Sequence, residues 1–334
     1  MATALFSRHR SPKRRPGQRR AATRIAPAIH RDLVPVGRST ESLEDRCLLS
    51  HNAIAGFGAV GDSLTDEYEF EAYDYAGNWL ELLVTERGLD FGATGVRGEP
   101  RREGYEYNWA RSGATSQSLL DDGQHTGLAG QVNAGDVSHA VLAVGPNDFF
   151  GSNQAFSNIY AGLWSSTQVD DFVDGLVLNI DSAMQTLTAT DVHLVVSGVA
   201  NYGIAPAVRT VYFLPSFRNR VSAVVDEVNC GIESLARGDG VPFIDTGGLT
   251  RALFGTNDSP INSQLIGGVQ FNNLAGSGVT NAFVADGVHP HTAIQALMAN
   301  AFVEALNSGY STGLVQFTEQ QIVEVVGETY GGSA

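Results

Sequence analysis

Four short blocks in the sequence hold residues that are suited to hydrolysing an ester. Ser63 lies in "GDSLTDEY", Gly113 in "NWARSGATS", Asn147 in "VGPNDF", and Asp286 and His289 in "VADGVHPH". A serine hydroxyl is a poor nucleophile until a neighbouring base takes its proton, and a third group must hold that base. The oxyanion that develops also needs hydrogen-bond donors, which backbone N–H groups and an asparagine side chain can supply. These residue types indicate nucleophilic acyl transfer, provided that the fold brings the blocks together.

The first block overlaps a second motif that would imply a redox enzyme. Gly56, Gly58 and Gly61 fit the G-x-G-x-x-G spacing of a turn that binds a dinucleotide. Such a turn needs a strand before its first glycine and a helix N-terminus after its third, where the pyrophosphate binds. Here the expected strand runs through Gly56 and Gly58, and the carboxylates of Asp62 and Asp66 follow, which would repel a pyrophosphate. We therefore interpret Gly56 and Gly58 as strand residues that allow close backbone packing, and Gly61 as the residue that lets the chain turn sharply.

Apolar runs alternate with segments of helical spacing from residue 53 onward. Strands are expected at residues 53–60, 107–113, 138–145, 191–199 and 241–247, and the main helices at residues 77–88, 169–187, 214–238 and 291–309. Strands that are apolar throughout and alternate with helices predict an α/β domain with a parallel sheet of about five strands, covered on both faces. Right-handed crossovers place the carboxyl ends of these strands at one edge of the sheet, where ligands bind. The polar blocks follow expected strands or precede the last helix, so they should meet at that edge.

Two segments are long for loops in a compact domain, namely residues 149–167 and 255–284. The first is rich in aromatic residues and directly follows the block of Asn147. Phe149, Phe150 and Trp164 could form a rim that contacts the substrate, or they could be ordinary loop packing, and the sequence leaves both interpretations open. The second segment is rich in Gly and Asn, and it leaves the shape of the substrate open.

The charge distribution divides the chain into a basic arm and an acidic body. Residues 1–50 hold 11 Lys or Arg and 4 Asp or Glu, whereas residues 51–334 hold 10 and 32. We expect a disordered arm at residues 1–52, one α/β domain at 53–310 and a tail at 311–334. The acidic body disfavours nucleic acid as a partner, because phosphates would be repelled. No run of about 18 apolar residues occurs, so no transmembrane segment is expected.

Taken together, the four blocks resemble those of the GDSL/SGNH hydrolase family, and they occur in family order within residues 54–308. The resemblance implies a flavodoxin-like, three-layer α/β/α sandwich with serine esterase or lipase chemistry. It makes Ser63 the nucleophile, His289 the general base and then acid, and Asp286 the group that orients His289. The oxyanion hole would consist of the backbone N–H groups of Ser63 and Gly113 and the side chain of Asn147. No metal or organic cofactor is expected.

A second serine motif, G-x-S-x-G at residues 309–313, is interpreted as a chance match. In α/β-hydrolases the catalytic histidine follows the serine along the chain, and no histidine follows Ser311.

Three functions are consistent with the sequence. The first is a serine esterase that cleaves acyl esters of a small molecule or a glycan, acetylated carbohydrate included. The second is a lipase or acyl-thioesterase with the same triad, and the third is a surface protein that keeps the fold for binding and has little activity. The complete set of Ser63, Asp286 and His289 speaks against the third, since a binding protein has no use for all three. Acyl length, the alcohol part and the oligomeric state stay open.

Residues 39–50, "STESLEDRCLLS", resemble an N-terminal segment of the LEPR-x-LL type, which occurs on large exported and surface proteins of some bacteria. The matching residues are Leu43, Glu44, Arg46, Leu48 and Leu49, with Asp45 in place of the usual proline. The segment predicts an exported protein, located outside the cell or in the envelope of a bacterium.

Overall fold

The computed structural model describes residues 54–326, so the basic arm with the segment at residues 39–50 lies outside the described residues, as do residues 327–334. The described elements are β1 (Phe57–Gly61), η1 (Tyr68–Phe70), α2 (Trp79–Arg87), β2 (Thr94–Gly98), β3 (Arg102–Tyr105), α3 (Ser116–Asp121), α4 (Gln124–Ala134), β4 (His139–Ala143), α5 (Pro146–Phe150), α6 (Ala155–Ala161), α7 (Ser166–Thr188), β5 (His193–Ser197), η2 (Tyr202–Ile204), α8 (Pro206–Val211), α9 (Pro215–Asp239), β6 (Phe243–Ile244), α10 (Thr246–Phe254), β7 (Ser263–Ile266), β8 (Val269–Ala275), β9 (Asn281–Phe283), α11 (Thr292–Tyr310) and α12 (Glu319–Val326).

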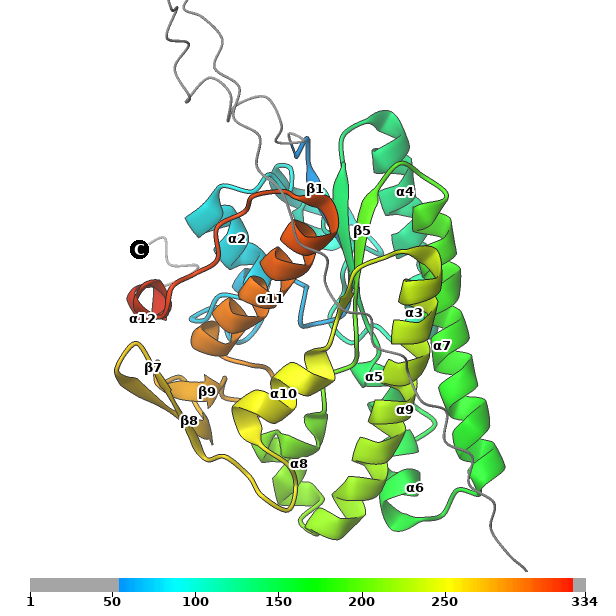
Figure 1. Ribbon diagram of the computed structural model, residues 1–334, viewed down its shortest axis with the longest axis vertical. Helices are drawn as coiled ribbons and strands as arrows, with labels where there is room; N and C mark the ends of the chain where they lie inside the picture. The colour runs from blue at the N-terminus through cyan, green and yellow to red at the C-terminus, as the bar shows by residue number, and fades with distance from the viewer. Residues whose placement is uncertain (1–53, 327–334) are drawn as a thin grey trace, which may run out of the picture. The chain divides into compact units, whose positions relative to one another are not determined.

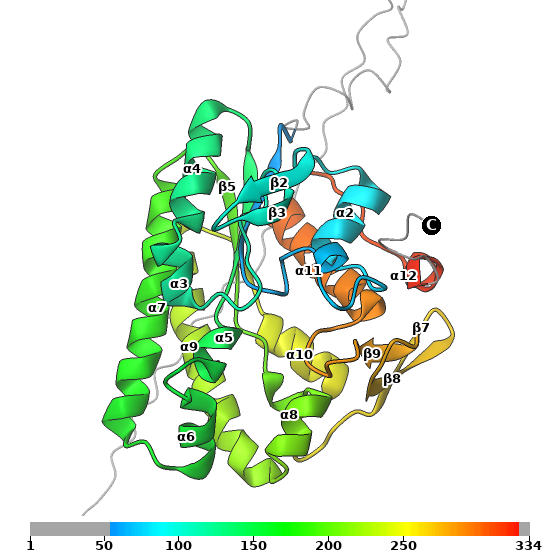
Figure 2. The ribbon, with the colours of Figure 1, turned by 180° about the vertical axis from the view of Figure 1, so that it is seen from behind.

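The central sheet is parallel, as predicted, with the strand order β1-β4-β5-β6. Its side chains alternate between two cores. Val60 and Leu142 belong to the core beneath α3, α4, α7 and α9, whereas Phe57 and Val141 belong to the core beneath α2, α11 and α12. Figures 1 and 2 show α2 and α11 on one side of the sheet and α4 and α7 on the other. The result is the predicted three-layer α/β/α arrangement.

The sheet has four strands rather than about five, because the segment expected as a strand at residues 107–113 is irregular. This segment runs beside β1, and the Trp109 N–H donates to the Ala59 carbonyl at 2.8 Å, but only one isolated bridge forms, between Ala59 and Asn108. The side chain of Asn108 accepts a hydrogen bond from the backbone N–H of Ala110 at 3.1 Å. A side chain that bonds its own backbone in this way competes with the ladder of a sheet.

Both expected loops contain secondary structure. Residues 149–167 include the end of α5, all of α6 and the start of α7, and residues 255–284 contain a small separate sheet with the order β7-β8-β9. The described part of the expected tail also packs on the domain. Ile322 and Val325 of α12 are buried in the core that also contains side chains of α2 and α11.

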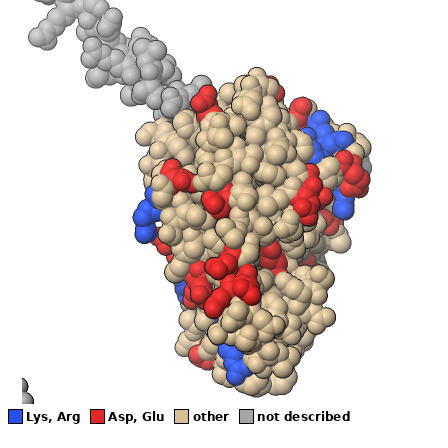
Figure 3. All heavy atoms as spheres, turned by 90° about the vertical axis from the view of Figure 1, so that its right-hand side faces the viewer, with Lys and Arg blue, Asp and Glu red and all other residues tan. Residues whose placement is uncertain are grey.

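Figure 3 shows one face of the molecule, on which acidic side chains outnumber basic ones. Exposed carboxylates of Asp170, Asp171 and Asp174 on α7 contribute to the negative charge of the body. Within residues 54–326, no helix combines the length and the apolar character that crossing a bilayer requires.

Candidate active site

Ser63 lies in a tight turn directly after β1. The carbonyl of Asp62 accepts the backbone N–H groups of Thr65 and Asp66, each at 2.9 Å, and its side-chain Oδ1 accepts the N–H of Leu64 at 3.0 Å. These bonds end the strand and hold the backbone on both sides of the serine. Asp62 therefore shapes the turn by hydrogen bonding.

The glycines before this turn are explained by close packing rather than by a phosphate site. A Cβ on Gly56 would lie 2.1 Å from the carbonyl oxygen of Asp136, and one on Gly61 would lie 2.3 Å from that of Ala143 in β4. Gly61 has no positive φ angle and is paired in the sheet, so the expectation that it permits a sharp turn is wrong. The neighbouring strand excludes a side chain there.

Ser63, His289 and Asp286 form one hydrogen-bonded series. The Nε2 atom of His289 lies 2.7 Å from the hydroxyl oxygen of Ser63, and its Nδ1 atom lies 2.5 Å from Oδ2 of Asp286. Oδ1 of Asp286 accepts the backbone N–H groups of Val288 and His289 at 2.7 and 3.0 Å. Burial alone would raise the pKa of Asp286, but its hydrogen bonds to His289 and Val288 and the charge of His289 lower it below the usual value. Asp286 is therefore a carboxylate that both fixes the loop and holds the imidazole.

Two tyrosines that the sequence analysis did not single out enclose the imidazole. The ring of Tyr73 stacks on that of His289 at 4.9 Å with an interplanar angle of 26°, and Tyr68 approaches the same ring edge-on at 6.2 Å. The hydroxyl of Tyr68 donates to the carbonyl of Pro290 at 3.2 Å and accepts from the side chain of Gln295 at 2.6 Å. Tyr73 lies 216 residues before His289 in an irregular segment, so no periodicity or motif could have indicated this contact.

Three hydrogen-bond donors come from the turn of Ser63, the glycine block and the block of Asn147. Within residues 54–326, neither the backbone N–H of Ser63 nor that of Gly113 makes a hydrogen bond to the protein. Gly113 has a φ of 83°, and no atom would lie within 4 Å of an added Cβ, so the backbone conformation rather than space favours glycine. The side chain of Asn147 donates one N–H to the carbonyl of Ala114 at 3.1 Å, which leaves its second N–H free to donate elsewhere.

Asp148 connects the Asn147 block to the glycine block. Its carboxylate accepts the backbone N–H and the hydroxyl of Ser116 at 2.8 and 2.7 Å, and burial raises its pKa. Burial also raises the pKa of Asp62 to about 7, and Oδ2 of Asp62 has no hydrogen-bond partner within the part of the chain that the structure describes. The turn that carries Ser63 is thus shaped by a buried carboxylate, and the segment that carries Asn147 is tied to the start of α3 by a partly buried one.

The predicted aromatic rim is only partly accessible. Phe149 is 2% exposed and packs edge-on against Phe172 in the core, so its assignment to a substrate rim is wrong. The ring is buried because α5 turns this side chain inward under α7. Phe150 is exposed and stacks on Phe156 at 4.9 Å, whereas Trp164 is half-buried against Phe172 at 5.6 Å.

His291 and Ser311, the remaining candidate residues, have structural roles at the two ends of α11. His291 is buried at the start of α11, where its Nδ1 accepts the N–H of Thr292 at 2.8 Å, and burial lowers its pKa to about 4. Ser311 ends α11 in a left-handed conformation with a φ of 55°. Among residues 54–326, no group of three or more His, Cys, Asp or Glu side chains is placed to hold a metal ion.

Comparisons with known proteins identify the family. Residues 57–302 match the family described as GDSL-like Lipase/Acylhydrolase. Similar solved structures include an extracellular lipase from Streptomyces rimosus, with 17% identity, a TM-score of 0.47, and coverage of 76% of this chain and 99% of the lipase. They also include a phospholipase A1 from Streptomyces albidoflavus, with 17% identity, a TM-score of 0.44 and coverage of 77% and 100%. An acetylxylan esterase from Geobacillus stearothermophilus has 13% identity, a TM-score of 0.41 and coverage of 75% and 93%. No curated protein sequence matches the chain.

Because the family match spans most of the chain and includes all four polar blocks, the protein belongs to the GDSL-like lipase/acylhydrolase family.

Proposed function

We propose that this member of an acylhydrolase family hydrolyses carboxylic esters through an acyl-enzyme on Ser63. The observation that carries the proposal is the hydrogen-bonded series from the Ser63 hydroxyl through His289 to Asp286, with distances of 2.7 and 2.5 Å. A nucleophile in contact with a base, and a base held by a third group, is the arrangement that activates serine.

In the first half of the reaction, the Ser63 oxygen attacks the ester carbonyl carbon while Nε2 of His289 takes the hydroxyl proton. The charge of Asp286 stabilises the imidazolium that forms. The imidazolium then gives its proton to the leaving alcohol as the carbon–oxygen bond breaks, which leaves an ester between Ser63 and the acyl group. In the second half, His289 takes a proton from water while the water oxygen attacks the acyl carbon. The bond between this carbon and the Ser63 oxygen then breaks, the carboxylic acid leaves, and the imidazolium returns its proton to Ser63.

The oxyanion of each tetrahedral intermediate would be held by three donors. We assign this role to the backbone N–H groups of Ser63 and Gly113 and to the second N–H of the Asn147 side chain, which have no hydrogen-bond partner within the described residues 54–326. Donors that are already fixed in place need no reorganisation when the charge develops, which is why such a site lowers the barrier.

Hydrolysis of p-nitrophenyl esters by the full-length chain tests the proposal. Ser63→Ala should lower kcat by about 10⁴-fold or more, because the nucleophile is lost. Ser311→Ala is the matched control, since Ser311 belongs to the competing serine motif and lies at the end of α11. Equal hydrolysis by wild type and Ser63→Ala would refute the assignment, and the absence of any hydrolysis by the wild-type protein would favour the alternative of a binding protein.

The organisation proposed with this function is an arm at residues 1–52, a hydrolase domain at 53–310 and a C-terminal segment at 311–334. The segment at residues 39–50 supports export to the cell envelope or the medium. Fractionation of the producing cells tests this part, because an exported enzyme should leave the cytoplasmic fraction and should return to it when residues 39–50 are deleted.

A further inference from the structure

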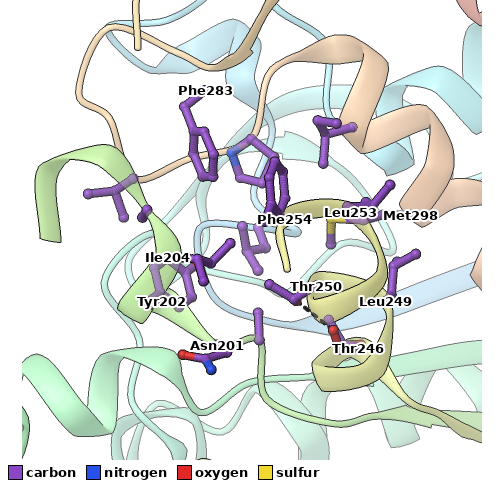
Figure 4. Close-up of a pocket in the computed structure, with 16 residues that line it drawn as sticks. Asn201, Tyr202, Ile204, Thr246, Leu249, Thr250, Leu253, Phe254, Phe283 and Met298 are labelled. Carbon is purple, nitrogen blue, oxygen red and sulfur yellow. Dashed lines mark hydrogen bonds between the residues drawn. The ribbon is translucent and has the colours of Figure 1, made fainter. Parts of the chain in front are cut away.

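Two cavities lie near the loop that carries Asp286 and His289, and they differ in size. The apolar pocket between η2, α10 and β9, shown in Figure 4, is lined by Val288 and Pro290 but by neither Ser63 nor His289. Its volume is about 40 Å³, which has room for a few water molecules and for no larger ligand. The second cavity is an open cleft of about 550 Å³, and small-molecule sites typically measure roughly 300–1,000 Å³.

This second cavity, the α8–β8 cleft, lies between α8, the start of α9, the loop after α10 and β8. Figures 1 and 2 show α8 and β8 near each other, and the two elements are in contact. The backbone N–H of Ala207 in α8 donates to the carbonyl of Gly287 at 3.0 Å, and the Cβ of Ala275 in β8 would lie 3.3 Å from a Cβ on Gly287. Two walls of the cleft thus support the loop between Asp286 and His289, although no residue of the triad lines the cleft.

Two arginines line the α8–β8 cleft, namely Arg209 of α8 and Arg218 of α9. Arg218 is only 3% exposed, and its Nε donates to Oδ1 of Asn257 at 3.1 Å and its Nη1 to the carbonyl of Tyr212 at 2.6 Å. Within residues 54–326, neither Nη2 of Arg218 nor the half-buried guanidinium of Arg209 makes a hydrogen bond, and neither arginine forms an ion pair with a carboxylate. Two cations with unused N–H donors therefore share the cleft.

The arginine pair is unfavourable unless an anion is bound beside it. Residues 51–334 contain only ten Lys or Arg, and two of them lie together here. Burial, and then the neighbouring charge of Arg209, lowers the pKa of Arg218. A buried cation is normally paired with an anion, and the guanidinium fork matches the two oxygens of a carboxylate or phosphate. The unused donors therefore indicate an anionic ligand.

The other polar groups of the cleft include hydrogen-bond acceptors, which favour hydroxyl groups on the same ligand. Asn273 is 8% exposed, and its Oδ1 has no partner among residues 54–326. Asp258 is exposed, and its Oδ2 accepts from the side chain of Asn219 at 2.7 Å. A bare anion would be repelled by Asp258, whereas a hydroxyl group could donate to it. Phe213, which is 69% exposed, adds an apolar face that could cover the C–H groups of a ring.

We propose that the α8–β8 cleft binds a hydroxylated organic anion of the size of a sugar acid. Its carboxylate would bind Arg209 and Arg218, and its hydroxyl groups would bind Asn273 and Asp258. A neutral sugar would leave the two positive charges uncompensated, and an inorganic anion would leave the acceptors unused. The proposal is independent of the reaction at Ser63, because no residue of the triad lines the cleft.

Calorimetric titration of the full-length protein with methyl glucuronoside and methyl glucoside tests the proposal. The two compounds share one ring and differ only in the carboxylate, and neither carries an ester that Ser63 could cleave. The glucuronoside should bind at least tenfold more tightly, because its hydrogen bonds to the arginines are charge-assisted. Equal affinities, or no binding of the glucuronoside, would overturn the proposal. Inorganic phosphate should bind more weakly than the glucuronoside, and equally tight binding would show a site for simple anions only.

A matched pair of arginine variants tests where the anion binds. Arg209→Gln removes a side chain that makes no hydrogen bond within residues 54–326, so the fold should persist and the affinity for the glucuronoside should fall by about tenfold or more. Arg237→Gln removes the same charge from the exposed end of α9, where Arg237 pairs with Glu233 at 2.6 Å, and should leave the affinity unchanged. Unchanged binding by Arg209→Gln, or equal weakening by both variants, would refute the assignment to the cleft.

Ser63→Ala separates the cleft from the catalytic serine. The variant should bind the glucuronoside with the affinity of the wild-type protein, because Ser63 does not line the cleft. A loss of binding in the folded Ser63→Ala protein would place the ligand at the triad and would overturn the proposal. Since binding is measured without turnover, a failure of the proposed hydrolysis and a failure of this inference are distinguishable.

Discussion

The buried imidazole of His139 should make the protein lose stability on acidification. His139 begins β4 with an exposed fraction of 1%, and its ring lies 4.7 Å from that of His193, its partner in β5. The Nε2 atom of His139 has no hydrogen-bond partner among residues 54–326. Burial, and then the neighbouring His193, lowers the pKa of His139 from 6.5 to about 4. A proton on this ring is therefore unfavourable in the folded state.

The direction of the effect follows from proton linkage. Because the pKa is lowered by folding, the unfolded chain binds a proton on His139 at a higher pH than the folded protein does. The stabilisation is fully present above pH 6.5 and is lost as the pH falls from 6.5 towards 4. The difference between the two pKa values corresponds to about 3 kcal/mol, of which about 2 kcal/mol should be lost between roughly pH 7 and pH 4.5.

The assay is urea unfolding of the full-length protein at these two pH values. His139→Phe keeps a ring in the site, and His139→Asn keeps a group that can bond the Ser138 hydroxyl, which lies 2.9 Å from Nδ1 of His139. Both changes can lower the absolute stability, so the quantity compared is the change in the free energy of unfolding with pH. It should be smaller in each variant than in wild type by about 2 kcal/mol. If all three proteins lose the same free energy, His139 does not resist protonation in the fold and the reasoning is refuted.

Three further predictions concern the candidate active site. Asp286→Asn removes the charge beside Nδ1 of His289 and should lower kcat by about 10³- to 10⁴-fold with little change in KM, and a loss below tenfold in steady-state kinetics would contradict the proposed role. Gly113→Ala should lower the free energy of unfolding by about 1 kcal/mol or more, because a φ of 83° is unfavourable with a Cβ, and should also lower kcat by moving the N–H donor. Unchanged kinetics in the folded variant would remove Gly113 from the oxyanion hole. Tyr73→Leu removes a stacked ring that is worth about 0.5–1.5 kcal/mol and should lower kcat by roughly 2- to 10-fold, whereas Tyr73→Phe keeps the stack and should retain the wild-type rate. Equal rates for the two Tyr73 variants would show that the stack does not position His289.

Much of the fold could be predicted from local patterns. The strand and helix boundaries expected for β4, β5, α7, α9 and α11 differ from the observed ones by a few residues, because continuous apolar runs and helical spacing are set within short windows of sequence. The last strand was expected at residues 241–247 but is only Phe243–Ile244. Asp245 explains the difference, since its carboxylate accepts the N–H of Gly248 at 2.7 Å and starts α10 at Thr246. A local capping interaction ended the strand early.

The sequence alone determined the family, the α/β class, the acidic body and the five residues proposed for the reaction, because each depends on residue type and on order along the chain. Tertiary structure decided the contacts among them. The 2.7 Å contact between Ser63 and His289 joins residues 226 positions apart. Tyr73 stacks on His289 through tertiary packing, which the sequence pattern does not predict. Folding also buried Phe149 and left the adjacent Phe150 exposed, although both are phenylalanines in the same aromatic segment. It also brought residues of η2, α10 and β9 together around an apolar pocket. Local patterns report only which face of an element is apolar, whereas a cavity depends on how several such faces meet.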